Sequence, residues 1–311
     1  MGVRRLVIAP SLAFPFLSFF SSCVGAFTMT GGSLYDARFG GIAQLHGVEA
    51  QAKLRDAHVC VIGLGGVGSW ACEALARSGV GALTLIDLDD ICVSNVNRQL
   101  HATDSTIGKL KVHEMQRRVM DINPECSVTA VADFVTGDNV KDVLTGKGFD
   151  AVLDAVDSVD DKCEIINLAR AINLPVVTVG AAGGMSDAGL IRTSDITRSE
   201  FDRLLHHVKK RLRQRYGFPT GSKRNLKGRK WGVASVWSAE KPPTLTPSTA
   251  NEGSSSFRKC DSLYGTACFV TGMFGFLAAS LVVQVLTGAE PGWSSSALRY
   301  RREVLAEAAA E

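Results

Sequence analysis

The sequence predicts an α/β fold built on a doubly wound, mainly parallel sheet. Three short, mainly apolar runs at 59–62, 83–86 and 149–153 are each followed by glycines or acidic residues and then by polar or helical segments. Short apolar runs that alternate with helical segments are typical of βαβ units, whose parallel strands are buried on both faces. With 311 residues, of which 46% are hydrophobic, the chain can bury a large core around one such sheet.

The first apolar run is followed by glycines with the spacing G-x-G-x-x-G, at Gly63, Gly65 and Gly68. Gly63 permits a tight turn, and Gly65 or the adjacent Gly66 lets backbone N–H groups approach a phosphate. Gly68 allows the following helix to pack closely on the strand, and the helix N-terminus favours an anion. Strand, loop and helix together predict a Rossmann-like nucleotide site. For the loop alone, a glycine-rich structural turn is the alternative.

The second run ends in Asp87, 19 residues after Gly68, where a carboxylate can accept hydrogen bonds from ribose hydroxyls. Asn95 and Arg98 follow in a polar segment, and Lys111 comes 13 residues after Arg98. Arg offers a planar fork of donors, and Lys offers a point charge for a pyrophosphate leaving group. A single Arg or Lys would more simply lie on a solvated surface. The ordered set favours ATP over a dinucleotide, because hydride transfer has no obvious need for it.

Asp154 and Asp157 lie at the end of the third run, at the edge of the sheet where open α/β folds bind ligands. A Mg²⁺ ion that bridges phosphate oxygens prefers carboxylate ligands, and Asp157 is the first candidate. The alternatives for Asp154 are to orient its neighbour or to cap the helix that begins near Asp160.

The segments GLGGVGS, LIDLDD, SNVNRQ, IGKLK and LDAVDS resemble the adenylyltransferase family of the ubiquitin-activating enzymes and the sulfur-carrier adenylyltransferases of thiamine and molybdopterin synthesis. The resemblance runs from about residue 38 to residue 193, and it implies ATP- and Mg²⁺-dependent adenylylation of a carboxylate. The candidate ATP-binding residues are Gly63, Gly65, Gly66, Gly68, Asp87, Asp89, Asn95, Arg98, Lys111, Asp157, Ser158 and Arg38. The residues implied for catalysis are Arg98, Lys111 and Asp157, and Asp157 is also the implied Mg²⁺ ligand.

The chain departs from this family at one arginine. The carrier adenylyltransferases usually have a second arginine three residues beyond the one that Arg38 matches, and this chain has Gly41 there. If an arginine crosses a dimer interface to reach ATP, Arg38 acts alone or another residue takes its place. The expectation of a homodimer comes from the resemblance only.

Within the family, the chain most resembles the branch of tRNA threonylcarbamoyladenosine dehydratases. The segments that carry this resemblance are RFGG, DINPEC, DFVTGDNV, VGAAGG, RLRQRYG and WSAEKP, and it extends to about Gly288. It implies that ATP activates the carboxylate of threonylcarbamoyladenosine next to the tRNA anticodon. Ring closure would then release AMP, after pyrophosphate has left. Because the nucleophile belongs to the substrate, the protein would mainly supply positioning and charge stabilisation.

None of the eight cysteines has C-x-x-C spacing, whereas the sulfur-carrier adenylyltransferases usually carry two such pairs for structural zinc. We therefore expect no zinc. Cys60 and Cys72 fit a strand and a helix core. Cys260 follows Arg258 and Lys259, a cationic setting that favours a reactive thiol, so it is a further catalytic candidate. An ordinary loop thiol is the alternative, and a sulfur-transfer partner stays open.

Residues 203–230 contain eleven Lys or Arg and no Asp or Glu, although the whole chain has 34 basic and 31 acidic residues. Charge concentrated in this way, beside Tyr216 and Trp231, suits a phosphate backbone better than a small carrier protein. The alternative is a solvated helix and loop. The candidate tRNA-binding residues are Lys209, Lys210, Arg211, Arg213, Arg215 and Lys230. The residues expected to pack inward are Leu204, Leu205, Val208 and Leu212.

The chain divides into five predicted segments. Residues 1–29 are a targeting or signal-like segment, 30–200 the ATP-binding domain, and 201–259 a basic helix and flexible loop that contacts tRNA. Residues 260–290 are a terminal apolar helix that completes the fold, and 291–311 are a tail. Gly, Pro and Ser are frequent at 217–256, which predicts a loop there.

Both ends raise the question of a membrane. An apolar stretch after Arg4 and Arg5, followed by small residues before Phe27, has a signal-peptide layout. With Phe27 it resembles the bipartite plastid presequences of algae with secondary plastids. Plastid import is therefore preferred, with a mitochondrial location, an anchored N-terminus or translation from Met29 as alternatives. The uncharged run 263–289 is long enough to span a bilayer, but a buried core helix is favoured over an anchor. Peripheral membrane association remains an alternative.

Three hypotheses for function remain. The first is an ATP-dependent tRNA dehydratase. The second is an adenylyltransferase that activates a ubiquitin-like or sulfur-carrier protein, which requires an essential cysteine and a diglycine-tailed partner. The third is a nucleotide-binding domain without catalysis or an NAD oxidoreductase, in which Arg98 and Lys111 would be dispensable.

Overall fold

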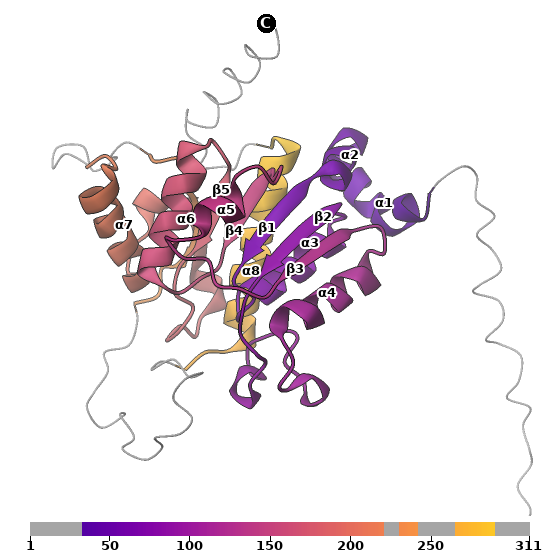
Figure 1. Cartoon of the computed structure of the whole chain (residues 1–311), viewed down its shortest axis with the longest axis horizontal. Coiled ribbons are helices and arrows are strands. Elements are labelled where there is room, and N and C mark those ends of the chain that lie inside the picture. Colours follow the sequence, from indigo (N-terminus) through magenta and orange to yellow (C-terminus); the bar gives the residue numbers. More distant parts are fainter. Residues whose placement is uncertain (1–32, 221–229, 242–264, 290–311) are drawn as a thin grey trace, which may run out of the picture.

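The computed structural model describes residues 33–220, 230–241 and 265–289, which form one sheet with helices on both faces (Figure 1). The sheet has seven strands in the order β3-β2-β1-β4-β5-β7-β6, and among them β6 alone runs antiparallel to its neighbour. The predicted doubly wound, mainly parallel α/β fold is confirmed. The strands are β1 His58–Ile62, β2 Ala82–Ile86, β3 Ser127–Val131, β4 Ala151–Asp154, β5 Val176–Val179, β6 Ile191–Asp195 and β7 Ala234–Ser238.

Helices from distant parts of the chain cover the two faces. On one face α2, α3, α4 and α8 pack on the sheet, and on the other α5, α6 and α7 do so. The helices are α1 Leu34–His46, α2 Val48–Asp56, α3 Gly68–Arg77, α4 Lys111–Ile122, α5 Val140–Leu144, α6 Val159–Ala171, α7 Arg203–Tyr216 and α8 Cys268–Thr287.

Strand β1 shows why the sheet is buried on both sides. Val59 and Val61 pack into the layer that contains α3 and α8, while Cys60 and Ile62 pack into the layer that contains α6. All four side chains are almost fully buried, because successive side chains of a strand point to opposite faces. Cys60 and, in α3, Cys72 are core residues, as the sequence predicts.

The prediction of a loop over residues 217–256 is wrong at 234–238. These residues form β7, which lies between β5 and β6 in the sheet. Sequence patterning missed this strand because it is short, contains two serines and has glycine- and proline-rich neighbours. The Ser235 hydroxyl is satisfied inside the sheet, where it donates to the Ser194 carbonyl oxygen at 3.0 Å. The segment after residue 201 thus contributes to the central sheet.

Helix α8 packs against α3 and the sheet, as expected for a core helix. Val270, Phe274, Ala278 and Val282 are fully buried along one side of the helix. Among the described residues it is also the one helix long and apolar enough to cross a membrane, and 56% of its most apolar window is buried inside the protein.

Helix α7 is amphipathic in the predicted way. Leu205, Val208 and Leu212 are fully buried against α6 and the end of the sheet, and Leu204 is partly buried. Several sequence predictions fall outside the described residues: the signal-like segment 1–29, Cys260, and the tail 291–311.

Candidate functional site

The glycine loop lies between β1 and α3 and begins with Gly63, whose φ is +86°. A Cβ atom on Gly63 would approach the Ala155 carbonyl oxygen to 2.9 Å, and one on Gly68 would approach the Gly63 carbonyl oxygen to 1.8 Å. Both positions therefore require glycine, the first for the turn and the second for the close packing of α3 on β1. A Cβ atom on Gly65 would meet nothing within 4 Å, so there is open space beside the loop.

Asp87 follows β2 and ties the glycine loop to the end of that strand. One carboxylate oxygen accepts a hydrogen bond from the Leu64 backbone N–H at 2.7 Å, and the other accepts one from the Asp89 backbone N–H at 2.9 Å. Burial raises the pKa of Asp87, and the Lys111 ammonium opposes this rise. Each oxygen keeps a second lone pair, so the carboxylate can still accept a hydrogen bond from a ribose hydroxyl.

Lys111 is the first residue of α4 and is only 5% exposed. Its Nζ lies 2.6 Å from Asp89 Oδ2 and 3.8 Å from Asp87 Oδ1. Three of the predicted ATP-binding residues thus form one ion-pair cluster beside the glycine loop. The two carboxylates fix the position of the ammonium at the end of β2.

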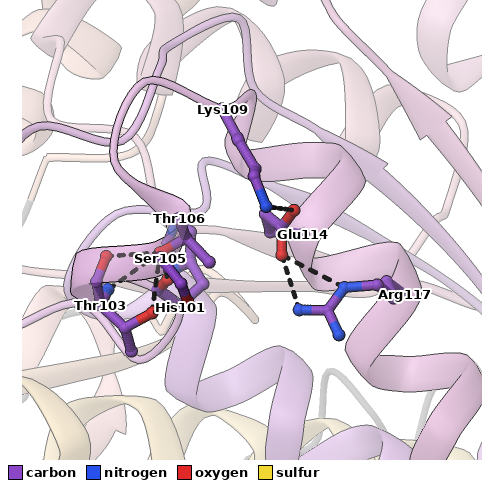
Figure 2. A network of polar contacts seen from close by, with 7 residues as sticks. All are labelled: His101, Thr103, Ser105, Thr106, Lys109, Glu114 and Arg117. Atoms are coloured by element: carbon purple, nitrogen blue, oxygen red, sulfur yellow. Dashed lines mark hydrogen bonds and ion pairs between the residues drawn. The ribbon is translucent and has the colours of Figure 1, made fainter.

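The segment that leads into α4 folds around the buried residue His101 (Figure 2). Thr106 Oγ1 donates a hydrogen bond to the His101 carbonyl oxygen at 2.6 Å and accepts one from the Thr103 backbone N–H at 2.9 Å. Both His101 ring nitrogens are buried and have no hydrogen-bond partner among the described residues. Burial, assisted by the charge of Lys111, lowers the pKa of His101 to about 4, so its imidazole is neutral at pH 7.

The first turn of α4 is bordered by a second set of ion pairs, also visible in Figure 2. The Glu114 carboxylate lies 3.4 Å from Lys109 Nζ and 2.7 Å from Arg117 Nη2. The side chain of Arg117 points outward and is 73% exposed. These pairs hold the segment before α4 against the helix that begins with Lys111.

Arg98 lies beside the glycine loop, as the sequence predicts. A Cβ atom on Gly66 would be 3.5 Å from Arg98 Cγ, so the stem of the arginine passes along the loop. Its Nη1 donates to the Ser94 carbonyl oxygen at 2.6 Å. The Arg98 carbonyl oxygen accepts hydrogen bonds from Trp70 Nε1 at 3.0 Å and Thr271 Oγ1 at 3.1 Å. Helices α3 and α8 therefore fix the backbone of Arg98.

Thr271 is a residue that sequence reasoning missed. The sequence feature that could have pointed to it is its place near the start of an apolar helix that has few other hydrogen-bonding side chains. Asn95, which was predicted to bind ATP, is buried and accepts a hydrogen bond from the Cys92 backbone N–H at 3.1 Å through its Oδ1. Asn97 Nδ2 donates to the Thr266 carbonyl oxygen at 2.9 Å, a second link between this loop and the start of α8.

Asp154, at the end of β4, is fully buried in an ion pair with Lys162 of α6, at 2.8 Å. Thr178 Oγ1 donates to the same carboxylate at 2.7 Å, and the other carboxylate oxygen accepts the Val156 backbone N–H at 3.2 Å. Asp154 thus orients the loop that follows it, and the alternative of a helix cap is wrong because Ser158 caps α6. Lys162 was missed, although it falls on the buried face of its helix.

Asp157 lies on the loop between β4 and α6 and is exposed. This loop touches the glycine loop, since the Cβ position of Gly63 lies 3.2 Å from the Val156 nitrogen. Ser158, a predicted ATP-binding residue, accepts the Asp161 backbone N–H at 3.4 Å. Among the described residues no group of three or more His, Cys, Asp or Glu side chains could hold a metal ion. Asp157 is thus an exposed carboxylate on a loop whose backbone lies against the glycine loop.

Arg38 lies away from the glycine loop. It lies on α1, and its Nη1 donates to the carbonyl oxygen of Ile122, at the far end of α4, at 3.3 Å. Lys111 begins that helix eleven residues earlier, so roughly 16 Å of helix separates the two ends. Within one chain, Arg38 is therefore remote from the other predicted residues.

The basic helix α7 lies close to the ligand-binding edge of the sheet. Its N-cap residue, Asp202, accepts the Leu205 backbone N–H at 2.8 Å and the backbone N–H of Ala181, just beyond β5, at 3.0 Å. Burial raises the pKa of Asp202. Further along, Arg211 forms an ion pair with Asp160 in the first turn of α6. Both contacts are with residues that follow the carboxyl ends of parallel strands, where the glycine loop also lies.

Comparison with known proteins places the chain in a family. The model of the ThiF family matches residues 40–304. The chain belongs to the ThiF family. It is 44% identical over 253 residues to the tRNA threonylcarbamoyladenosine dehydratase of Haemophilus influenzae, covering 81% of this chain and 94% of that protein.

Solved structures of the same family agree with the fold. This ThiF-family chain superposes on Escherichia coli tRNA N6-threonylcarbamoyladenosine dehydratase, TcdA, crystallised in complex with ATP, with a TM-score of 0.72 and 41% identity. The match covers 83% of this chain and 96% of TcdA. The E. coli sulfur carrier protein ThiS adenylyltransferase is 38% identical, but over 136 residues, 44% of this chain and 53% of that protein.

Proposed function

We propose that this ThiF-family chain uses ATP to dehydrate threonylcarbamoyladenosine next to the anticodon of tRNA. The single observation that carries the proposal is that the match spans nearly the whole length of known tRNA threonylcarbamoyladenosine dehydratases. The sequence identity is 44% to the Haemophilus influenzae protein and 41% to the E. coli protein crystallised with ATP. The clustered glycine loop, Asp87, Arg98 and Lys111 support ATP as the nucleotide.

The reaction has two steps. A carboxylate oxygen of the substrate attacks the α-phosphorus of ATP, the bond to the β-phosphate breaks, and pyrophosphate leaves. A nucleophile of the substrate then attacks the carbonyl carbon of the acyl adenylate, and its proton passes to solvent. The bond to AMP breaks, so the nucleoside has lost one water. Positive charge on Lys111 and Arg98 would stabilise the charge that develops on phosphate, and Asp87 would hold the ribose.

Mg²⁺ would neutralise phosphate charge in the first step. The donor set fits this ion, because Mg²⁺ bound with nucleotide usually takes one or two carboxylates and completes its shell with phosphate oxygens and water. Asp157 is exposed on the loop between β4 and α6, which lies against the glycine loop, whereas Asp154 is occupied by Lys162 and Thr178. Asp157 is thus the proposed ligand.

Three further elements belong to the proposal. The chain would form a homodimer, and Arg38, which lies away from the loop of its own chain, would be the arginine that crosses to the partner's nucleotide, as the resemblance to the family implies. The basic helix α7 would contact tRNA.

The segment 1–29 would direct the protein to a plastid, with a mitochondrion or a membrane-anchored form as alternatives. A fluorescent fusion of that segment would test this localisation.

The runner-up is an adenylyltransferase for a ubiquitin-like or sulfur-carrier protein, which the partial likeness to the ThiS adenylyltransferase favours. Pyrophosphate release separates the two functions. The full chain is incubated with ATP, Mg²⁺ and tRNA that either contains or lacks threonylcarbamoyladenosine. The proposal expects AMP and pyrophosphate only with the modified tRNA. Pyrophosphate release that ignores the modification but requires an added diglycine-tailed protein would favour the runner-up.

A further inference from the structure

The basic residues of α7 fall into two groups that the sequence alone does not separate. The inner group is engaged within the protein, on the two flanks of the helix. On one flank Lys209 Nζ donates to the Ser199 carbonyl oxygen at 2.7 Å and to its hydroxyl at 2.9 Å. On the same flank the guanidinium carbon of Arg213 lies 5.1 Å from the centroid of the Trp231 ring. Burial lowers the pKa of Lys209, as expected for an ammonium partly withdrawn from water.

The opposite flank of α7 is held by a carboxylate of α6. Both Arg211 and Arg215 lie against Asp160, with Arg215 Nη1 3.4 Å from Oδ1. Tyr216 adds a hydrogen bond to Glu164. Four of the basic residues predicted to bind tRNA, one of them Arg215 with a 61% exposed side chain, therefore already help to attach α7 to the rest of the fold.

The outer group lies between these flanks. Arg203, His206, His207, Lys210 and Gln214 are all exposed. Their spacing of three, four and seven residues places them on one face of an α-helix, opposite the buried leucines. The rings of His206 and His207 are 5.6 Å apart, edge to face. Lys210 has no hydrogen bond or ion pair among the described residues. In Figure 1, α7 lies at the left edge of the described fold, beyond α6.

We infer that this outer face, made by His206, His207 and Lys210 with Arg203 and Gln214, is the surface that contacts tRNA. The inference rests on the proposed function and deepens it. No acidic residue occurs between 203 and 230, so the face is complementary to phosphate. Imidazole rings also stack on unpaired bases, which the loop of a tRNA offers. A polyanionic membrane or protein surface has no such bases, and this favours RNA as the occupant.

A charge series at Gln214 tests the surface without disturbing a contact. Binding of the full chain to tRNA is measured at several salt concentrations, without ATP, so that no turnover is needed. Gln214→Lys is expected to tighten binding severalfold, and Gln214→Glu to weaken it severalfold. Lys210→Ala should lower the slope of log affinity against log salt by about one. The double variant His206→Ala/His207→Ala should bind about tenfold more weakly.

The controls are Lys53→Ala, an exposed lysine on α2, and Lys209→Met on the inner flank. Both should keep the salt slope of the unchanged protein, and Lys209→Met should lower the melting temperature. Equal tRNA affinity of Gln214→Lys and Gln214→Glu would overturn the inference. It would also be overturned if the variants of the outer face bound anionic lipid vesicles less well but kept the tRNA affinity of the unchanged protein. Binding that responds as expected, with no dehydration of the nucleoside, would retain the surface and refute the proposed reaction.

Discussion

At the scale of single residues, the site is organised by carboxylates that each hold two or more partners. Asp87 contacts the glycine loop, the backbone of Asp89 just after β2, and Lys111. Asp154, at the end of β4, contacts Lys162 of α6 and Thr178 of β5. Each is almost completely buried, so each must be paired to be tolerated. Asp157, by contrast, is exposed, and the Arg98 guanidinium bonds within its own loop, to the Ser94 carbonyl oxygen at 2.6 Å.

Replacing Arg98 tests the proposed phosphate contact. Arg98→Ala is expected to lower kcat about 100-fold, because a lost donor to charge in the transition state typically costs 10²–10³ in rate. The matched control is Arg117→Ala, which removes an exposed arginine that contacts Glu114. Rates of AMP formation with saturating tRNA are measured for both variants. Unchanged turnover in Arg98→Ala would remove this residue from the site.

Lys162→Met tests the buried pair. The variant leaves the Asp154 carboxylate buried without its cation, and the free energy of unfolding should fall by about 3–5 kcal/mol. Thr178→Val removes only one hydrogen bond to the same carboxylate and should cost about 1 kcal/mol. Urea unfolding compares the two variants. A cost for Lys162→Met as small as that of Thr178→Val would mean that the pair does not support the fold.

His101 makes stability depend on pH. Its pKa is lowered to about 4 in the folded protein, against an ordinary value near 6.5. Below pH 6.5 the unfolded chain therefore binds a proton that the folded protein rejects. This contribution to stability is complete above pH 6.5 and declines as the pH falls to 4, by about 3 kcal/mol in total. His101→Gln should flatten the difference in unfolding free energy between pH 6.5 and 4. An identical pH profile in the variant would contradict the assignment.

At the scale of elements, α8 is a structural support for the site. It crosses α3 so closely that a Cβ atom on Gly275 would lie 2.7 Å from both Trp70 Cβ and the Val67 carbonyl oxygen. The same helix supplies Thr271 to the Arg98 loop. The position of α8 therefore determines the positions of α3, the helix that follows the glycine loop, and of Arg98.

Gly275→Ala tests this support. The added methyl group must push α8 and α3 apart, which should destabilise the protein by about 1–3 kcal/mol and weaken ATP binding. Gly40→Ala in α1 is the control, because a Cβ atom there meets nothing within 4 Å and alanine favours a helix. Melting temperature and ATP affinity are measured together. If Gly275→Ala were as benign as Gly40→Ala, α8 would not be the support described.

At the scale of the whole molecule, the sequence predicted the fold class, the glycine loop and the grouping of Asp87, Arg98 and Lys111. These are encoded in local spacing along β1, α3, β2 and the segment that leads to α4. It did not predict β7, which depends on pairing with β5 and β6 far away in the chain, or the buried Lys162, whose burial depends on the packing of α6 against Asp154 and Thr178. It also could not divide the basic residues of α7, since their inner or outer position follows from contacts with α6 and Trp231.

The central claim joins the nucleotide site at the edge of the sheet to a tRNA substrate. Nucleoside mass spectrometry tests it most directly, on tRNA that carries threonylcarbamoyladenosine and has been incubated with the full chain, ATP and Mg²⁺. The account predicts that threonylcarbamoyladenosine is replaced by a nucleoside lighter by one water, and that omitting ATP prevents this. A nucleoside of unchanged mass in the complete reaction would contradict the account.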